Sequence, residues 1–240
     1  MSTTSTLPHT GAIDAQQRLL RVAARAIGRA HFAHAYGHCS VRLSPSEFLV
    51  CAAKPMGLIG ASDTGTVVNV DGALPEGVLG EVRIHQEIYR RHPHIGGVVR
   101  SMPPAVMALS AARLTPRCLH GIGTYFSAGV PLWDDPQLVR TPEQAAAVAE
   151  TLGMASAVVM RGNGAVVAGG SLEDAVVLTW YLEDTARMDL ALRGAGLSDR
   201  AAVIPQADAQ LRATRVGRIF ERMWEYLTAG DSESMEMVSA

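Results

Sequence analysis

Apolar residues recur at helical spacing in several stretches of the chain. Between residues 14 and 35, leucine, valine, isoleucine and alanine return every three or four positions, which predicts an amphipathic helix that ends before Gly37. Thr141 followed by Pro142 is typical of the first residues of a helix. The same reasoning predicts further helices over residues 78–91, 105–112, 142–152, 172–192 and 216–227.

Short runs of β-branched and other apolar residues alternate with these helices. They predict strands over residues 39–43, 47–52, 66–70, 97–102, 157–160 and 165–168. The last two flank Arg161-Gly162-Asn163-Gly164, whose Asn-Gly pair indicates a tight hairpin turn. With no internal repeat and no long linker, we expect one α/β domain over residues 12–196. A disordered lead-in (1–11) precedes it, and a helical C-terminal extension (197–240) with a disordered end follows.

The composition is that of a soluble globular protein and excludes several functions. Of 240 residues 48% are hydrophobic, and a net charge of -2 provides no basic surface for nucleic acid or an anionic membrane. No apolar run reaches the roughly 18 residues of a membrane span, and the N-terminus does not resemble a secretory signal. Three cysteines without a CxxC pair favour a reducing, cytoplasmic location. Abundant alanine and arginine are typical of a high-GC bacterial gene.

Common catalytic motifs are absent. His31, His34 and His38 have helical spacing, but Gly37 breaks the helix before the third, which argues against a zinc site. The hairpin turn does not match a nucleotide-binding loop, and no serine lies in a G-x-S-x-G turn. Lys54 is the only lysine, so amine chemistry would fall to it or to the N-terminus.

Four segments, in their order and intervals, resemble the class II aldolase/adducin superfamily. They are Gly37-His38-Cys39-Ser40-Val41-Arg42, Gly80-Glu81-Val82-Arg83-Ile84-His85, Val98-Val99-Arg100-Ser101-Met102-Pro103-Pro104 and Met160-Arg161-Gly162-Asn163-Gly164-Ala165-Val166-Val167. The resemblance covers about residues 14–195. It implies a single-domain α/β/α sandwich with a mostly antiparallel central sheet, a small-molecule substrate, and a homotetramer with pockets between neighbouring subunits. The first segment is similar to the branch that decarboxylates hydroxylated aromatic or ring-derived acids.

Superfamily members hold a divalent metal such as Zn or Mn on three histidines. The resemblance places those ligands at Arg100, Met102 and Asn163 of this chain. A guanidinium cannot ligate a metal, and a thioether and a carboxamide are poor ligands for Zn, Mn or Mg. We therefore expect no metal at these positions and no other cofactor. The alternative is a metal relocated to other histidines, namely His38, His85 or His120.

The resemblance also implies roles for the remaining site residues. Glu81 matches the catalytic carboxylate, a general acid/base, although a glutamate at a helix start also favours the helix dipole. Arg100 would replace the metal as the group that stabilises a developing oxyanion, and Asn163 completes the catalytic set. Arg161, two residues before the hairpin tip, would add a second cation.

Three more residues border the substrate pocket by resemblance: His38, Ser40 and Lys54. Lys54 lies in the loop that binds a substrate phosphate or carboxylate, so it would clamp an anion or act as an amine nucleophile. Trp224 and Tyr226 of the last helix are candidates for packing on the body or on a neighbouring subunit.

The expected function is a metal-independent lyase of the decarboxylase or aldolase type, acting on a small carboxylated or enolisable substrate. The same residues also allow an isomerase, a dehydratase or a cyclase, because those reactions need only proton transfer beside an oxyanion site. The alternative outside enzymes is a non-catalytic assembly module of the adducin kind.

Overall fold

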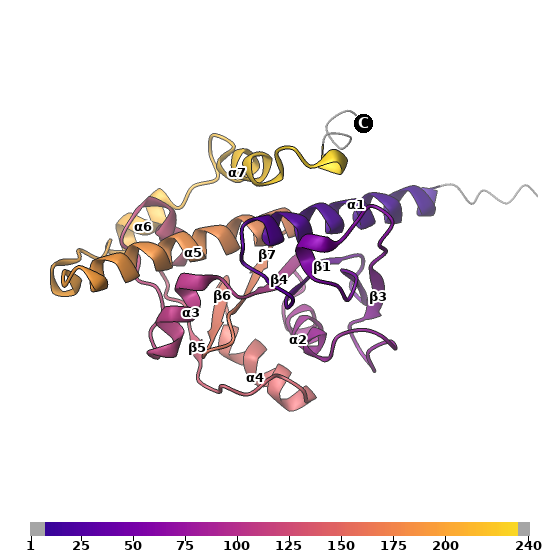
Figure 1. The fold of residues 1–240 in the computed structure, drawn as a ribbon, viewed down its shortest axis with the longest axis horizontal. Helices are drawn as coiled ribbons and strands as arrows, with labels where there is room; N and C mark the ends of the chain where they lie inside the picture. The colour runs from indigo at the N-terminus through magenta and orange to yellow at the C-terminus, as the bar shows by residue number, and fades with distance from the viewer. Residues whose placement is uncertain (1–7, 235–240) are drawn as a thin grey trace, which may run out of the picture.

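The computed structural model describes residues 8–234, and a seven-stranded sheet forms the centre of this part (Figure 1). The strands are β1 (His38–Arg42), β2 (Glu47–Val50), β3 (Thr66–Asn69), β4 (Gly97–Ser101), β5 (Leu132–Trp133), β6 (Ala157–Met160) and β7 (Ala165–Gly169). Their order across the sheet is β3-β2-β1-β4-β7-β6-β5, and every neighbouring pair is antiparallel except β5 with β6. The expected mostly antiparallel sheet is confirmed.

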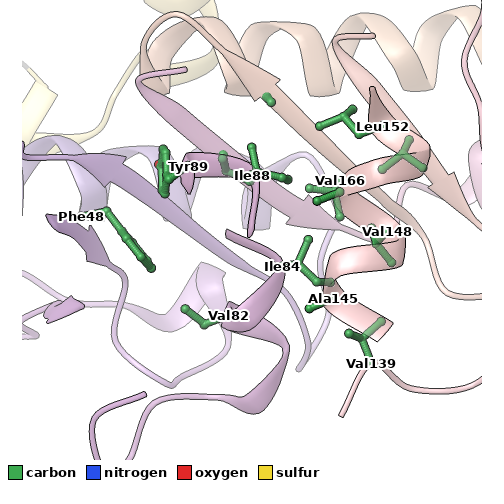
Figure 2. Packing of buried hydrophobic residues seen from close by; sticks show 14 of the residues in the cluster. Phe48, Val82, Ile84, Ile88, Tyr89, Val139, Ala145, Val148, Leu152 and Val166 are labelled. Atoms are coloured by element: carbon green, nitrogen blue, oxygen red, sulfur yellow. The ribbon is translucent and has the colours of Figure 1, made fainter. Parts of the chain in front are cut away.

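Helices cover both faces of the sheet, as in the predicted α/β/α sandwich. They are α1 (Pro8–Arg29), α2 (Arg83–Arg91), α3 (Pro104–Ala111), α4 (Pro142–Leu152), α5 (Leu172–Gly194), α6 (Gln206–Arg212) and α7 (Ile219–Thr228). The helices α1 and α5 lie on one side, and α2 and α4 on the other (Figure 1). Figure 2 shows Ile84 and Ile88 of α2 packed beside Val148 of α4 over the sheet.

Successive residues of the central strands point to opposite faces, and both faces are buried. Val98 belongs to the hydrophobic cluster with α2 and α4, whereas Val99 belongs to the cluster with α1 and α5. Val166 and Val167 divide between the two faces in the same way. This double burial explains why the strands read in the sequence as unbroken apolar runs rather than as alternating ones.

The first helix differs from its prediction at both ends. It begins at Pro8, although the lead-in was expected to extend to residue 11, and it ends at Arg29 instead of residue 35. His31 has a φ of 59°, and this left-handed conformation stops the helix early. The disorder expected for residues 1–7 and 235–240 falls outside the described residues.

Three elements depart from the predicted pattern in other ways. The single helix expected over residues 78–91 is a 3₁₀ turn, η2 (Gly80–Val82), followed by α2. Neither β5 nor α6 was predicted. The strand β5 has only two residues and is defined by its pairing with β6, so it leaves no periodic signal in the sequence.

Two further observations concern the cysteines and the apolar content of the helices. The three cysteines are free and buried, as small core residues would be: Cys39, Cys51 and Cys118. Within residues 8–234, no helix has the length and apolar content needed to cross a membrane.

The C-terminal extension is anchored to the body of the molecule. The helix α7 lies along α5 and α1 (Figure 1). Phe220 is buried in an apolar cluster, and Trp224 packs against two such clusters, so the expected packing of the last helix on the body is confirmed for Trp224. Tyr226 points away and is 70% exposed.

Five charged side chains fasten the end of this extension to α1. Arg25 contacts Asp231 at 2.7 Å and Glu233 at 2.8 Å. Arg21 contacts Glu233 at 2.5 Å, and Arg29 contacts Asp231 at 2.9 Å. The two carboxylates are buried beneath the arginines. We call these five residues the C-terminal clamp.

Candidate active site

A cavity of about 860 Å³ opens where β1 begins and β4 ends, beside the turn that precedes α2. Five of the seven predicted site residues line it: His38, Lys54, Glu81, Arg100 and Asn163. Met102, the remaining one of the three expected metal positions, lines it as well. The sequence therefore predicted which segments meet at this place.

The pairing of β1 with β4 brings the first two site residues together. His38 lies opposite Arg100 in this antiparallel pair. Alternate residues of a strand share a face, so Ser40 lies on the same side as His38, toward α2. Gly37, with a φ of 122°, makes the turn into β1, and a Cβ there would come within 3.1 Å of the Arg100 carbonyl oxygen. Only glycine suits this turn.

The hairpin between β6 and β7 carries Asn163 to the same place. Its tip lies directly on the end of β4, because a Cβ on Gly164 would be only 2.0 Å from the carbonyl oxygen of Ser101. Arg100 Nη2 donates a hydrogen bond to Asn163 Oδ1 at 2.8 Å. The Asn-Gly turn predicted from the sequence thus positions a polar group over the strand end.

Glu81 lies beside Arg100 and Asn163, and these three residues form what we call the cavity floor. Its Oε2 lies 3.1 Å from Arg100 Nε, and its Oε1 lies 3.5 Å from Asn163 Nδ2. The side chain of Arg100 is 2% exposed and that of Glu81 is 20% exposed. The Glu81 carboxylate therefore lies on the more open side of this ion pair, and the guanidinium is buried behind it. Burial raises the pKa of Glu81, but neighbouring polar groups, among them the Arg100 guanidinium, outweigh it, and the pKa lies below its ordinary value. Glu81 is ionised at neutral pH.

A line of buried polar groups extends from this floor toward α2. His38 Nδ1 lies 2.8 Å from His85 Nε2, and His85 Nδ1 lies 2.6 Å from Ser40 Oγ. Ser40 Oγ lies 2.9 Å from the Tyr89 hydroxyl. Burial lowers the pKa of both imidazoles, so His38 and His85 are neutral at neutral pH. We call these four residues the buried polar chain.

Two predicted cations are engaged by acidic neighbours. Lys54 lines the rim, with its Nζ 2.6 Å from Asp63 Oδ1 and its side chain 54% exposed. Arg161 is not among the lining residues, and its guanidinium pairs with Asp134 on the far side of the hairpin. The structure therefore does not bring Arg161 to the other site residues.

Three residues of the site were not assigned a catalytic or substrate-binding role from the sequence, although His85 was an alternative metal ligand. His85 and Tyr89 follow Glu81 at intervals of four, and this spacing on one helical face was a signal that could have found them. Arg140 lines the cavity from the segment before α4, and no ion pair or hydrogen bond of its guanidinium is formed within the described residues. No sequence signal marks Arg140, because the loop that carries it has no periodicity.

The side chains present do not fit a divalent metal. Arg100 and Asn163 hydrogen bond to each other where the resemblance places metal ligands, and a guanidinium offers no lone pair to a cation. His85 uses both ring nitrogens within the buried polar chain, and His120 contacts Asp184 on α5 away from the cavity. Across residues 8–234, no three His, Cys, Asp or Glu side chains are grouped as a metal site.

The fold and these segments define a class of protein. Residues 17–190 match the model of the Class II Aldolase and Adducin N-terminal domain, and the chain belongs to this family. The resemblance drawn from the four sequence segments is confirmed.

Relatives within the family are decarboxylases and aldolases by name. The 3,4-dihydroxyphthalate decarboxylase of Arthrobacter keyseri is 32% identical over 212 residues, which are 81% of this chain and 84% of the relative. Decarboxylase tropJ of Talaromyces stipitatus is 30% identical over 67% of this chain and 70% of its own. The solved L-fuculose 1-phosphate aldolase of Glaciozyma antarctica superposes with a TM-score of 0.77 at 18% identity, over 99% of this chain and 95% of that one, which shows the shared fold.

Proposed function

We propose that this protein is a carbon–carbon lyase, a decarboxylase that acts on a small hydroxylated ring acid without a divalent metal. One observation carries the proposal. A buried guanidinium, Arg100, is held by Glu81 and Asn163 on the cavity floor, where related enzymes are expected to hold a metal. The decarboxylases among the relatives support the reaction type, and their name for the substrate, dihydroxyphthalate, supports the ring acid.

The reaction needs an electrophile and a group that moves a proton. The ring carbon that bears the carboxylate first takes up a proton, which gives a ketone tautomer. The bond to the carboxylate carbon then breaks, carbon dioxide leaves, and the electron pair restores the aromatic ring and returns negative charge to the former hydroxyl oxygen. Arg100 stabilises that oxygen through Nη1, which forms no hydrogen bond, while Nε pairs with Glu81. Glu81 takes the proton of the hydroxyl and returns it to the ring carbon. Solvent then supplies the proton that the product oxygen needs, so the net reaction consumes one proton.

The lining of the cavity suits such an acid. Its cationic side chains are Arg100, Lys54 and Arg140, against one acidic side chain, Glu81. This excess of positive charge favours a carboxylated substrate. The rim adds apolar side chains for a ring, namely Tyr36, Leu79 and Leu138.

The homotetramer implied by the resemblance stays a prediction. The apolar side chains most exposed near the cavity and on the last helix, Tyr36 at 67%, Leu58 at 74% and Tyr226 at 70%, are available for contacts between subunits. Multi-angle light scattering of the purified protein gives the number of chains directly.

The decisive experiment combines metal analysis with a decarboxylation assay. Protein purified without a tag is incubated with 3,4-dihydroxyphthalate and related hydroxylated mono- and diacids, with and without a chelator, and carbon dioxide release is measured. We expect turnover that the chelator does not change, and a loss of about 10²-fold or more in Glu81→Gln. Stoichiometric metal on which turnover depends would overturn the metal-free mechanism. Binding of these acids without turnover of any of them would favour a binding module over an enzyme.

A further inference from the structure

The buried polar chain has a fourth contact at its Tyr89 end. The Tyr89 hydroxyl also lies 3.1 Å from the carbonyl oxygen of Ser40, to which it can only donate. The chain therefore comprises four contacts: His38 with His85, His85 with Ser40, Ser40 with Tyr89 through their hydroxyls, and Tyr89 with the Ser40 carbonyl. The two neutral imidazoles and the two hydroxyls supply one proton each, which makes four protons for four contacts.

Only one arrangement places a proton in every contact. Tyr89 donates to the Ser40 carbonyl, so the Ser40 hydroxyl donates to the Tyr89 oxygen. Ser40 has then spent its proton and must accept from His85 Nδ1. His85 Nε2 is left with a lone pair, so it accepts from His38 Nδ1. If each of these hydrogen bonds pointed the other way, only three protons would lie in the four contacts. The Tyr89 oxygen and the Ser40 carbonyl oxygen would then face each other, buried and without a proton between them.

The arrangement determines which nitrogen of His38 lacks a proton. His38 is neutral and carries its proton on Nδ1, so Nε2 has a free lone pair. Two observations agree with this result. Nε2 is buried and forms no hydrogen bond, and its distance of 3.9 Å from Glu81 Oε2 is too long for one. Two acceptors facing each other would keep such a distance.

We infer that His38 is the proton-holding partner of Glu81, and that His85, Ser40 and Tyr89 are positioning residues that keep its Nε2 free to accept. The inference rests on the proposed function for the transfer itself. The position of the proton on His38 follows from the buried polar chain alone.

The proposed transfer moves one proton and leaves its bonding electrons on the substrate. The oxygen–hydrogen bond of the substrate breaks, its electron pair stays on the substrate oxygen beside Arg100, and the proton passes to Glu81 Oε2. A movement of about 1 Å then brings Glu81 within hydrogen-bond distance of His38 Nε2, which holds the proton until the ring carbon takes it up and carbon dioxide can leave. The proton returns through Glu81 to the ring carbon. Glu81, Arg100 and His85 are the charged or titratable groups that face His38.

The first test needs neither a variant nor a substrate. Two-bond proton–nitrogen correlation spectra of the uniformly ¹⁵N-labelled protein at neutral pH report which ring nitrogen of each histidine carries hydrogen. We expect His38 and His85 both to be protonated on Nδ1. A proton on Nε2 of His38 would overturn the inference, whatever reaction the protein catalyses.

The second test reverses the buried polar chain from a distance. Tyr89→Phe removes the phenol, so Ser40 can donate to His85 Nδ1, His85 then donates from Nε2, and His38 is left with its proton on Nε2. We expect this reversal in the spectra and a loss of about 10²-fold in kcat with KM nearly unchanged.

Tyr125→Phe is the matched control, because its phenol also donates to a carbonyl, that of Thr214, away from the cavity. It should leave both the spectra and kcat unchanged. Tyr89→Phe with a lower Tm but unaltered spectra and kcat would reduce the buried polar chain to a structural role. Reversed spectra with normal kcat would overturn the proton-holding role of His38. Absence of turnover in the unmodified protein would instead contradict the proposed function and leave the position of the proton standing.

Discussion

Arginines meet carboxylates in two places in this molecule, and the two clusters are built differently. In the C-terminal clamp, Arg25 donates from all three of its nitrogens, to Asp231, to Glu233 and to a backbone carbonyl. On the cavity floor, Arg100 Nη2 donates a hydrogen bond to Asn163 and Nε pairs with Glu81 at 3.1 Å, while Nη1 has no polar partner. Every nitrogen of Arg25 therefore donates a hydrogen bond, whereas Arg100 keeps a nitrogen that donates none.

The difference separates stability from function. A buried donor without a partner costs about 1–3 kcal/mol, so a fold tolerates it where a ligand later provides the partner. In the clamp every nitrogen of Arg25 donates a hydrogen bond, three bonds to the C-terminal extension and one to the Ile59 carbonyl. Arg100 is the more buried of the two and forms fewer hydrogen bonds, which agrees with the proposed role of the cavity floor.

The largest expected effect comes from removing the cavity arginine. Arg100→Met should lower kcat for the decarboxylation by about 10²–10³-fold, because the developing oxyanion loses its charged donor. The free energy of unfolding should fall by less than in the clamp, because Glu81, the carboxylate left without its partner, is 20% exposed at the side chain and can be solvated. Steady-state kinetics and denaturant unfolding measure the two quantities.

Arg25→Met is the matched variant in the clamp and should show the opposite pattern. It leaves buried carboxylates without their partner, so we expect a loss of about 2–3 kcal/mol in the free energy of unfolding and an unchanged kcat. Loss of activity in Arg25→Met, or full activity in Arg100→Met, would break the distinction between the two clusters.

The clamp should also make stability depend on pH. Burial opposes the charge of Asp231, but hydrogen bonds from Arg25 and Arg29 lower its pKa from 3.8 to about 2. Because the pKa is lower in the folded state, the stabilisation is complete above about pH 5 and is lost as the pH falls through about 4 toward about 2. Asp231→Asn should therefore cost about 2 kcal/mol at pH 7 and progressively less in acid.

Urea unfolding at pH 7 and at several acidic pH values measures this difference. Glu150→Gln is the control, since Glu150 is exposed on α4. It should shift the free energy of unfolding by less than about 0.5 kcal/mol at every pH. A cost of Asp231→Asn that does not change with pH would show that the clamp does not act through charge.

A smaller effect is expected at the rim of the cavity. Arg140 is exposed and its guanidinium is free of ion pairs within the described residues, so its contribution to binding an anionic substrate is screened by solvent. Arg140→Ala should raise KM about fivefold with kcat unchanged, and the increase of KM with ionic strength should weaken. An effect on kcat instead of KM would place Arg140 among the catalytic groups.

The smallest effect is expected for Lys54, the other rim cation. Its amine is held by Asp63 at 2.6 Å, so less of its charge is available to a substrate than that of Arg140. Lys54→Met should change KM by less than about twofold. A larger increase than in Arg140→Ala would reverse this order, and a covalent adduct on Lys54 after borohydride reduction would show amine chemistry.

Local sequence patterns predicted most of the elements and the general position of the site. The apolar runs predicted the positions of the strands, and the Asn-Gly turn predicted Asn163 at a hairpin tip. The meeting of Glu81, Arg100 and Asn163 followed from the resemblance to a family whose fold this chain shares. These predictions succeeded because spacing along a helix or strand determines which side chains share a face.

Partners of the charged side chains were decided by the tertiary structure alone. Arg25 and Asp231 are 206 positions apart, and the contact that removes Arg161 from the cavity is made with a loop that has no periodic pattern. The direction of the hydrogen bonds in the buried polar chain likewise follows only when its four contacts are considered together. Periodicity describes one element at a time, whereas the protonation and pairing of a buried polar group depend on every neighbour that folding brings around it.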